Sequence, residues 1–106
     1  MSNTYVVYIS QRAFTSLIEC VSFVKRLSPE SAENLYREIM ASIQSLSTFP
    51  KRNPEVDGLK IQNNPTRKMI IDGGRYIILY RIDGNQVIVY DVLDSRRDNK
   101  VISILL

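Results

Sequence analysis

The sequence predicts an α+β domain in which an antiparallel pair of helices packs on one face of a mainly antiparallel sheet of about four strands. Two β-branched and aromatic runs, residues 75–82 and 86–93, flank Asp83-Gly84, a dipeptide typical of hairpin turns. Two segments with apolar residues at helical spacing precede them, and a short β-rich run opens the chain. From its length, the chain of residues 1–106 is expected to be a single domain.

The first half of the chain is predicted to hold one strand and two helices. Residues 5–9 form the strand, and Ser10 can cap a helix over residues 11–26. Ser28-Pro29 begins a second helix, which Pro50 ends. Because one or two residues separate the helices, they should form an antiparallel hairpin. The residues expected to be buried are Phe14, Leu17, Ile18, Val21 and Val24 in the first helix, and Ala32, Leu35, Tyr36, Ile39, Ile43 and Leu46 in the second.

The second half is predicted to form a loop followed by a meander. Residues 51–66 are polar and interrupted by prolines and a glycine, so we expect a long surface loop, a kind of segment that is often functional. The runs 68–71, 75–82 and 86–93 should then pair as three antiparallel strands. Asn85 makes a three-residue loop as plausible as a two-residue one, so the register of the hairpin is left open.

Alternation along residues 75–82 separates two faces of the sheet. The side chains assigned to the helices are Tyr76, Ile78, Tyr80 and Ile82, with Leu35, Ile39 and Ile43 packing against Ile78 and Tyr80. The opposite face carries Arg75, Ile77, Leu79 and Arg81. An exposed apolar patch rimmed by basic side chains suggests a site for a partner. The alternative is that the last residues, VISILL, fold over Ile77 and Leu79, and both hold if the tail covers only part of the patch.

Composition excludes several kinds of site. The chain has no histidine, which excludes imidazole bases and Cys/His zinc motifs, and we expect neither metal nor cofactor. Cys20 cannot form an internal disulfide and is expected to be a small core residue. With no long apolar run and no secretory signal at the N-terminus, a cytoplasmic protein is expected. The net charge of +3 arises within residues 51–106, which suggests an anionic partner, either nucleic acid or an acidic polypeptide, or simply a solvated mixed surface.

Three stretches carry a family resemblance. The second helix and its exit, SAENLYREIMASIQSLSTFP, end in Leu-x-x-Phe-Pro; the hairpin reads YIILYRIDGNQVIVYDVL; and the segment DSRRD follows it. In this order they resemble the RelE/ParE superfamily of toxins from type II, plasmid-stabilisation toxin–antitoxin systems. The resemblance implies a toxin that arrests growth and a cognate antitoxin that neutralises it in a hetero-oligomer.

The superfamily divides by mechanism, because RelE-like members cut mRNA in the ribosomal A site and ParE-like members inhibit DNA gyrase. Metal-independent RNA cleavage by 2′-OH attack needs a base, an acid and cations at the phosphate. If the chain is a nuclease, the residues expected to be catalytic are Arg67, Arg75, Arg81, Arg97 and, as a base in the long loop, Glu55. Ile77 stands where nuclease members usually have an arginine, and no Tyr or His follows Asp98, so the ParE-like branch is favoured. A degenerate member that only binds antitoxin is a further alternative.

The residues expected to bind the target or the antitoxin are Arg75, Ile77, Leu79, Arg81, Asp94, Arg96 and Arg97. Asp94 stands where many members have histidine. The plainer interpretation of Arg96 and Arg97 is a solvated strand end with a local ion pair, and for Arg81 it is a cross-strand contact.

Overall fold

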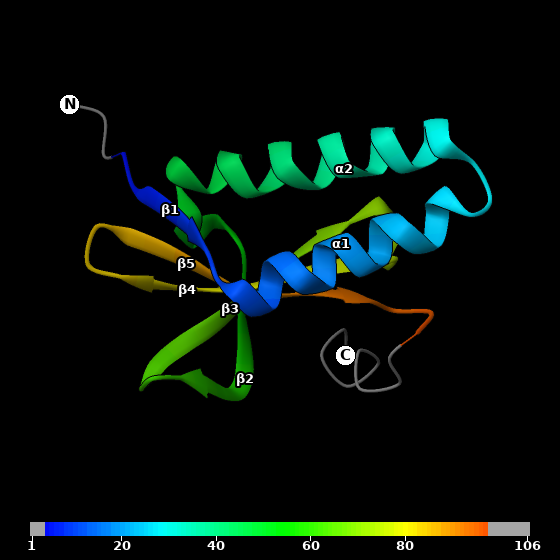
Figure 1. The fold of residues 1–106 in the computed structure, drawn as a ribbon. Helices are drawn as coiled ribbons and strands as arrows, with labels where there is room; N and C mark the ends of the chain where they lie inside the picture. The colour runs from blue at the N-terminus through cyan, green and yellow to red at the C-terminus, as the bar shows by residue number, and fades with distance from the viewer. Residues whose placement is uncertain (1–3, 98–106) are drawn as a thin grey trace.

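The computed structural model describes residues 4–97, which form two α-helices on one face of a five-stranded sheet (Figure 1). The elements in chain order are β1 (Val6–Ile9), α1 (Gln11–Lys25), α2 (Pro29–Gln44), the 3-10 turns η1 (Ser45–Ser47) and η2 (Pro50–Arg52), β2 (Glu55–Ile61), β3 (Asn64–Ile71), the turn η3 (Asp72–Gly74), β4 (Tyr76–Asp83) and β5 (Gln86–Asp94). The strands lie in the order β1-β5-β4-β3-β2, and only the β1–β5 pair is parallel. The predicted α+β class is therefore confirmed, with one strand more than expected.

The helix termini follow the predicted capping residues. The Ser10 hydroxyl accepts the Ala13 N–H at 3.0 Å, and the Ser28 hydroxyl accepts the Ser31 N–H at 3.2 Å. Pro29 occupies the first turn of α2, where its missing N–H costs nothing. The two helices lie side by side and antiparallel, as expected (Figure 1). Neither described helix is long and apolar enough to cross a membrane.

The buried face of α1 differs from the predicted one. Ala13, Leu17 and Cys20 are buried, whereas Phe14 and Ile18 are 44% and 40% exposed. The reason is a polar contact that the apolar pattern does not contain: Asp91 of β5 accepts hydrogen bonds from Ser16 and Arg12, which rotates that side of α1 toward the sheet. In α2 the predicted residues are buried, apart from Tyr36, which is 37% exposed.

The predicted loop over residues 51–66 is wrong, because most of it forms a β-hairpin. β2 and β3 are joined by Gln62 and Asn63, both with positive φ, as a type I′ turn requires. Gly58, at φ +74°, lies where the β2–β3 register shifts. A bulge of this kind breaks the two-residue alternation that identifies a strand, so Val56 and Leu59 pack into the same cluster although they are three residues apart.

β4 is buried on both faces. Tyr76, Ile78 and Tyr80 join the helices in the main core, as predicted, together with Leu35, Ile39 and Ile43. On the opposite face Ile77 and Leu79 are 0% and 4% exposed, because side chains of β2 and β5 cover them. The covering residues are Val56, Leu59 and Leu93. The expected exposed apolar patch is therefore wrong, and the segment VISILL lies outside the described residues.

The hairpin between β4 and β5 has a two-residue loop. Asp83 pairs with Gln86, so the loop consists of Gly84 and Asn85. Gly84 has φ +60°, a conformation that glycine adopts without a steric penalty. The Asp83-Gly84 signal thus located the turn, but Asp83 itself belongs to the strand.

Replacing Ile39 by Ala should lower the free energy of unfolding by roughly 2–5 kcal/mol, the usual cost of truncating a fully buried aliphatic side chain. Ile39 is 0% exposed in the core between α2 and the sheet. Urea unfolding followed by circular dichroism measures the loss. Gln44→Ala, an exposed change at the end of the same helix, is the matched control and should be close to neutral. A loss below about 0.5 kcal/mol for Ile39→Ala would mean that the face assignment of α2 is inverted.

Candidate functional site

Arg67 and Glu55 face each other across the β2–β3 ladder. Glu55 pairs with Arg67 in the register, and their side chains form an ion pair at 3.2 Å. The Arg67 guanidinium also donates to the carbonyl oxygens of Asn53, at 2.6 Å, and Lys51, at 3.2 Å. The 18% exposure of the Arg67 side chain fits this role of closing the turn before β2. Arg67 is thus engaged in holding the fold, and Glu55 lies on a strand rather than in a free loop.

Arg81 is buried on the outer face of the sheet. It is 7% exposed, and its guanidinium donates to the Gln62 side chain at 2.9 Å, so the turn between β2 and β3 lies over it. Its cross-strand neighbour is Thr66, which is also buried. Arg81 Nε and Thr66 Oγ1 have no hydrogen-bond partner among residues 4–97. A side chain held in this way cannot reach a phosphate at the surface without opening the β2–β3 hairpin.

The other predicted site residues gather where β5 ends. Arg75 precedes β4, and its carbonyl oxygen accepts the N–H and the hydroxyl of Ser95, at 2.8 and 3.1 Å. Asp94 accepts the Arg96 N–H at 3.0 Å, and its carboxylate lies 3.9 Å from Arg96 Nε. The Arg97 guanidinium lies over the ring of Phe23 on α1, 5.7 Å from the ring centre. Arg75, Asp94, Arg96 and Arg97 therefore form one cluster, which we call the cationic end.

Asp94 organises the cationic end. Its side chain is only 4% exposed, and this burial raises the pKa of the carboxyl group, while Arg75 and Arg97 act in the opposite direction by favouring the charged form. By binding the backbone of Arg96, the carboxylate fixes the turn that leads out of β5. The side chain of Arg96 is 50% exposed, and Arg97 is exposed as well. The cationic end thus presents two arginines to solvent on a fixed backbone.

The residues proposed for catalysis fall into two groups. Arg75 directly precedes β4, and Arg81 lies within the strand near its other end. The two are six residues apart, which is about 20 Å along an extended strand. Arg67 and Glu55 lie at the Arg81 end, since Arg67 pairs with Tyr80, while Arg97 lies at the Arg75 end. Ile77 and Leu79, between the two groups, are covered by β2. The fold therefore brings the predicted binding residues of the cationic end together and keeps the predicted catalytic set apart.

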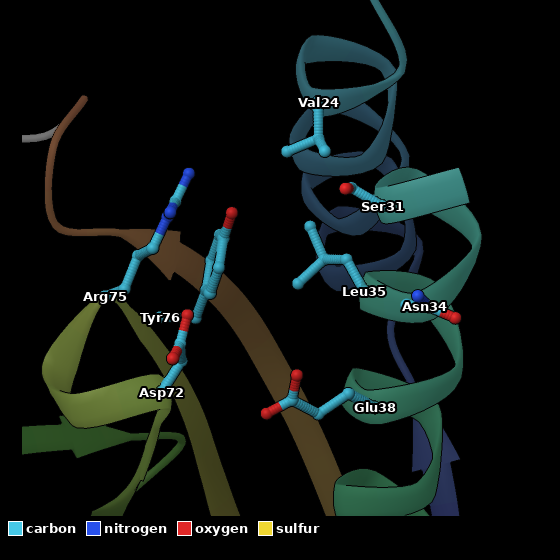
Figure 2. Close-up of a pocket in the computed structure, with 8 residues that line it drawn as sticks. All are labelled: Val24, Ser31, Asn34, Leu35, Glu38, Asp72, Arg75 and Tyr76. Carbon is cyan, nitrogen blue, oxygen red and sulfur yellow. The ribbon is translucent and has the colours of Figure 1, made fainter. Parts of the chain in front are cut away.

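A cavity of about 220 Å³, which the sequence did not reveal, opens between the helix hairpin and the start of β4. Arg75 and Tyr76 stand on one wall, and Leu35, Asn34 and Glu38 stand on the opposite wall (Figure 2). The other lining residues are Val24, Ser31 and Asp72. Arg75 Nε is buried without a hydrogen-bond partner among the described residues. The one feature of the sequence that points to this cavity is Asp72-Gly73-Gly74, because the turn that it forms places Asp72, at φ +55°, among the lining residues.

A second cavity, of about 190 Å³, lies between α1 and the end of β5. It is lined by Ser16, Glu19, Cys20, Asp91, Val92, Leu93, Asp94 and Arg97. Cys20 is 4% exposed, and burial raises the pKa of its thiol to about 11. The interpretation of Cys20 as a core residue is supported by this burial, which disfavours the reactive thiolate. Among residues 4–97, no cluster of His, Cys, Asp and Glu could hold a metal ion.

The sequence matches a family model described as the ParE toxin of type II toxin–antitoxin system, parDE, over residues 7–99. The chain belongs to this family. Among solved structures, the fold of the ParE toxin described here is similar to a chain described as "Chromosomal ParDE TA system from P. aeruginosa", with a TM-score of 0.69 and 13% identity. That similarity covers 88% of this chain and 98% of the other. A comparison with curated proteins gives no match.

The family match confirms the resemblance to the RelE/ParE superfamily and places the chain among ParE toxins. Of the three stretches that carried the resemblance, the first ends at the turn after α2 and the second is the β4–β5 hairpin. The third stretch contributes Asp94, Arg96 and Arg97 to the cationic end of this ParE toxin.

The thiol of Cys20 should react slowly with Ellman's reagent in the native ParE toxin. Thiolate is the reacting species, and raising the pKa from its ordinary value near 8.5 to about 11 leaves very little thiolate at pH 8. We expect the reaction rate of the native protein to be at least about a hundredfold below that of the same chain unfolded in urea. The unfolded chain is a clean control because Cys20 is its single thiol. Equal rates in the two states would show that the α1–β5 contact opens readily in solution.

Proposed function

We propose that this ParE toxin arrests growth in the cytoplasm by binding DNA gyrase, and that a cognate antitoxin neutralises it in a toxin–antitoxin hetero-oligomer. The proposal rests on membership of the ParE family and on one observation, the separation of the candidate nuclease residues into two groups at opposite ends of β4. Arg96 and Arg97 are exposed and can contact another protein, whereas the candidate nuclease residues are too far apart to act on one phosphate. This arrangement favours a toxin that acts by binding.

The nuclease alternative demands more than the site supplies. Metal-independent cleavage of RNA requires a base at the 2′-OH, an acid at the leaving oxygen and donors within hydrogen-bonding distance of the same phosphate. Arg75 lies about 20 Å from Arg81, measured along β4, and Arg97 lies at the Arg75 end, so neither can meet Arg81 at one phosphate. Glu55, the proposed base, is paired with Arg67. A RelE-like endoribonuclease therefore has less support than a binding toxin.

The cationic end supplies the proposed contact surface. Arg96 and Arg97 are exposed, and Asp94 holds the backbone that carries them. Exposed arginines on a fixed backbone steer an anionic partner and bind its carboxylates in pairs of hydrogen bonds. Because Ile77 and Leu79 are buried, the same end, and not the middle of β4, is the surface that we propose for an acidic segment of the antitoxin.

Purified toxin should inhibit DNA supercoiling by gyrase, and Arg96→Ala and Arg97→Ala should each weaken that inhibition by up to about fivefold. The effects should be gradual because each change removes one exposed charge contact among several, worth at most about 1 kcal/mol. Arg37→Ala is the matched control, since it removes an exposed cation of α2 that is paired with Glu33. Its inhibitory concentration should equal that of the wild type.

Primer-extension toeprinting on programmed ribosomes tests the alternative directly. The binding proposal predicts intact mRNA with the wild-type toxin. Codon-specific cuts that disappear in Glu55→Ala or Arg75→Ala, with affinity for the ribosome unchanged, would contradict the proposal and establish a nuclease.

A further inference from the structure

Phe49 is both highly exposed and held in a left-handed backbone conformation. It lies in the turn between η1 and η2, the residue is 76% exposed, and its backbone is left-handed, with φ 53° and ψ 53°. A bulky residue with positive φ is a true steric outlier. Pro50 follows directly and further disfavours a helical conformation at the preceding residue. Glycine or asparagine would adopt this conformation at lower cost.

The turn that carries Phe49 is held from two sides. The Arg52 guanidinium donates to the carbonyl oxygens of Thr48, at 2.7 Å, of Phe49, at 3.1 Å, and of Ser45, at 3.3 Å. From the core, the Tyr80 hydroxyl donates to the carbonyl oxygen of the buried Pro50 at 2.5 Å. Strained backbone persists only where the surrounding contacts fix it, and these contacts do so. The conformation of Phe49 is therefore a built part of the fold.

The fold accounts for the turn but not for the phenyl ring. The buried Pro50 and its hydrogen bond from Tyr80 explain why the chain reverses direction here. They do not require an aromatic side chain at residue 49, because a ring that is 76% exposed contributes little to folding. An aromatic ring on a fixed backbone loses little conformational freedom on binding, and such rings dominate the energetics of protein interfaces.

The charges around Phe49 indicate the kind of surface that it fits. Lys51 and Arg52 follow it in the chain and are exposed, and Arg67 lies beneath them, donating to the carbonyl oxygen of Lys51. The nearby carboxylate of Glu55 is already paired with Arg67. An apolar ring beside Lys51, which forms no ion pair within residues 4–97, is complementary to an apolar socket whose rim carries carboxylates.

We propose that Phe49 is an anchor that inserts into an apolar socket rimmed by carboxylates on the protein that this toxin arrests. The inference rests on the proposed function, since it describes the same target. It adds a contact remote from the cationic end. The Tyr5 N–H donates to the Ser47 carbonyl oxygen and Val6 pairs with Gln86, so the turn that carries Phe49 lies near the start of β5. Arg96 follows the opposite end of β5. The nine residues of β5 span about 27 Å, a distance that an interface of about 800 Å² per partner can cover.

Growth arrest upon induced expression, measured beside the thermal unfolding midpoint of each purified variant, tests the anchor. Phe49→Ala and Phe49→Gly should reduce arrest and raise the inhibitory concentration against gyrase at least tenfold. Their unfolding midpoints should match the wild type, and the glycine variant should be equal or higher because it relieves the left-handed strain. Phe49→Trp should keep most of the activity. Leu27→Ala is the matched control, because Leu27 is equally exposed, at 77%, between the helices.

The outcomes separate the anchor from the proposed function. If the wild type is active and Phe49→Ala is equally active, the anchor is wrong and the proposed function stands. The same conclusion follows if activity is lost only in those Phe49 variants that also lose thermal stability. A wild type that arrests growth without inhibiting gyrase overturns the gyrase target, and the arrest assay still decides the role of Phe49. A wild type that does neither overturns the proposed function. If Phe49→Ala weakens binding to a fluorescently labelled DNA duplex alone, the ring inserts between bases and the protein socket is wrong.

Discussion

The burial of β4 on both faces is the constraint on which the rest of the structure depends. The helices cover Tyr76, Ile78 and Tyr80, while β2 and β5 cover Ile77 and Leu79. Removing apolar surface from water stabilises by about 25 cal/mol per Å², so a strand buried on two sides fixes the layers around it. Because β4 is the centre of the sheet, residues at its two ends are kept apart by its whole length.

This separation divides the arginines by role. Arg52 and Arg67 satisfy backbone carbonyl groups around the turns that follow α2, and Arg81 lies under the β2–β3 turn. Arg96 and Arg97 are exposed at the far end of β5. A basic second half of the chain thus proves to be partly structural, and only the outward arginines are available to an anionic surface. Positive charge in the sequence alone could not make this distinction.

The sequence predicted those features that depend on neighbouring residues. Ser10 and Ser28 cap their helices, and the alternation along β4 identified the residues that meet α2, because each signal is local. The features that were missed depend on distant contacts. The rotation of α1 follows from Asp91, which is 75 residues from Ser16, and β2 was concealed by the bulge at Gly58. Whether Leu79 is exposed cannot be judged from β4 alone, because side chains of β2 cover it.

For the candidate site, the sequence indicated the residues of the cationic end. Their separation from Arg81 follows only from the strand register.

The free energy of unfolding of Leu79→Ala tests the double burial of β4 most directly. Leu79 is 4% exposed, so the change should cost roughly 2–5 kcal/mol in urea unfolding. Ile70→Ala, a change to a 49% exposed aliphatic residue of β3, should cost much less. A Leu79→Ala variant that keeps wild-type stability but loses affinity for a partner would contradict this account, because it would place Leu79 on an open binding face rather than beneath β2.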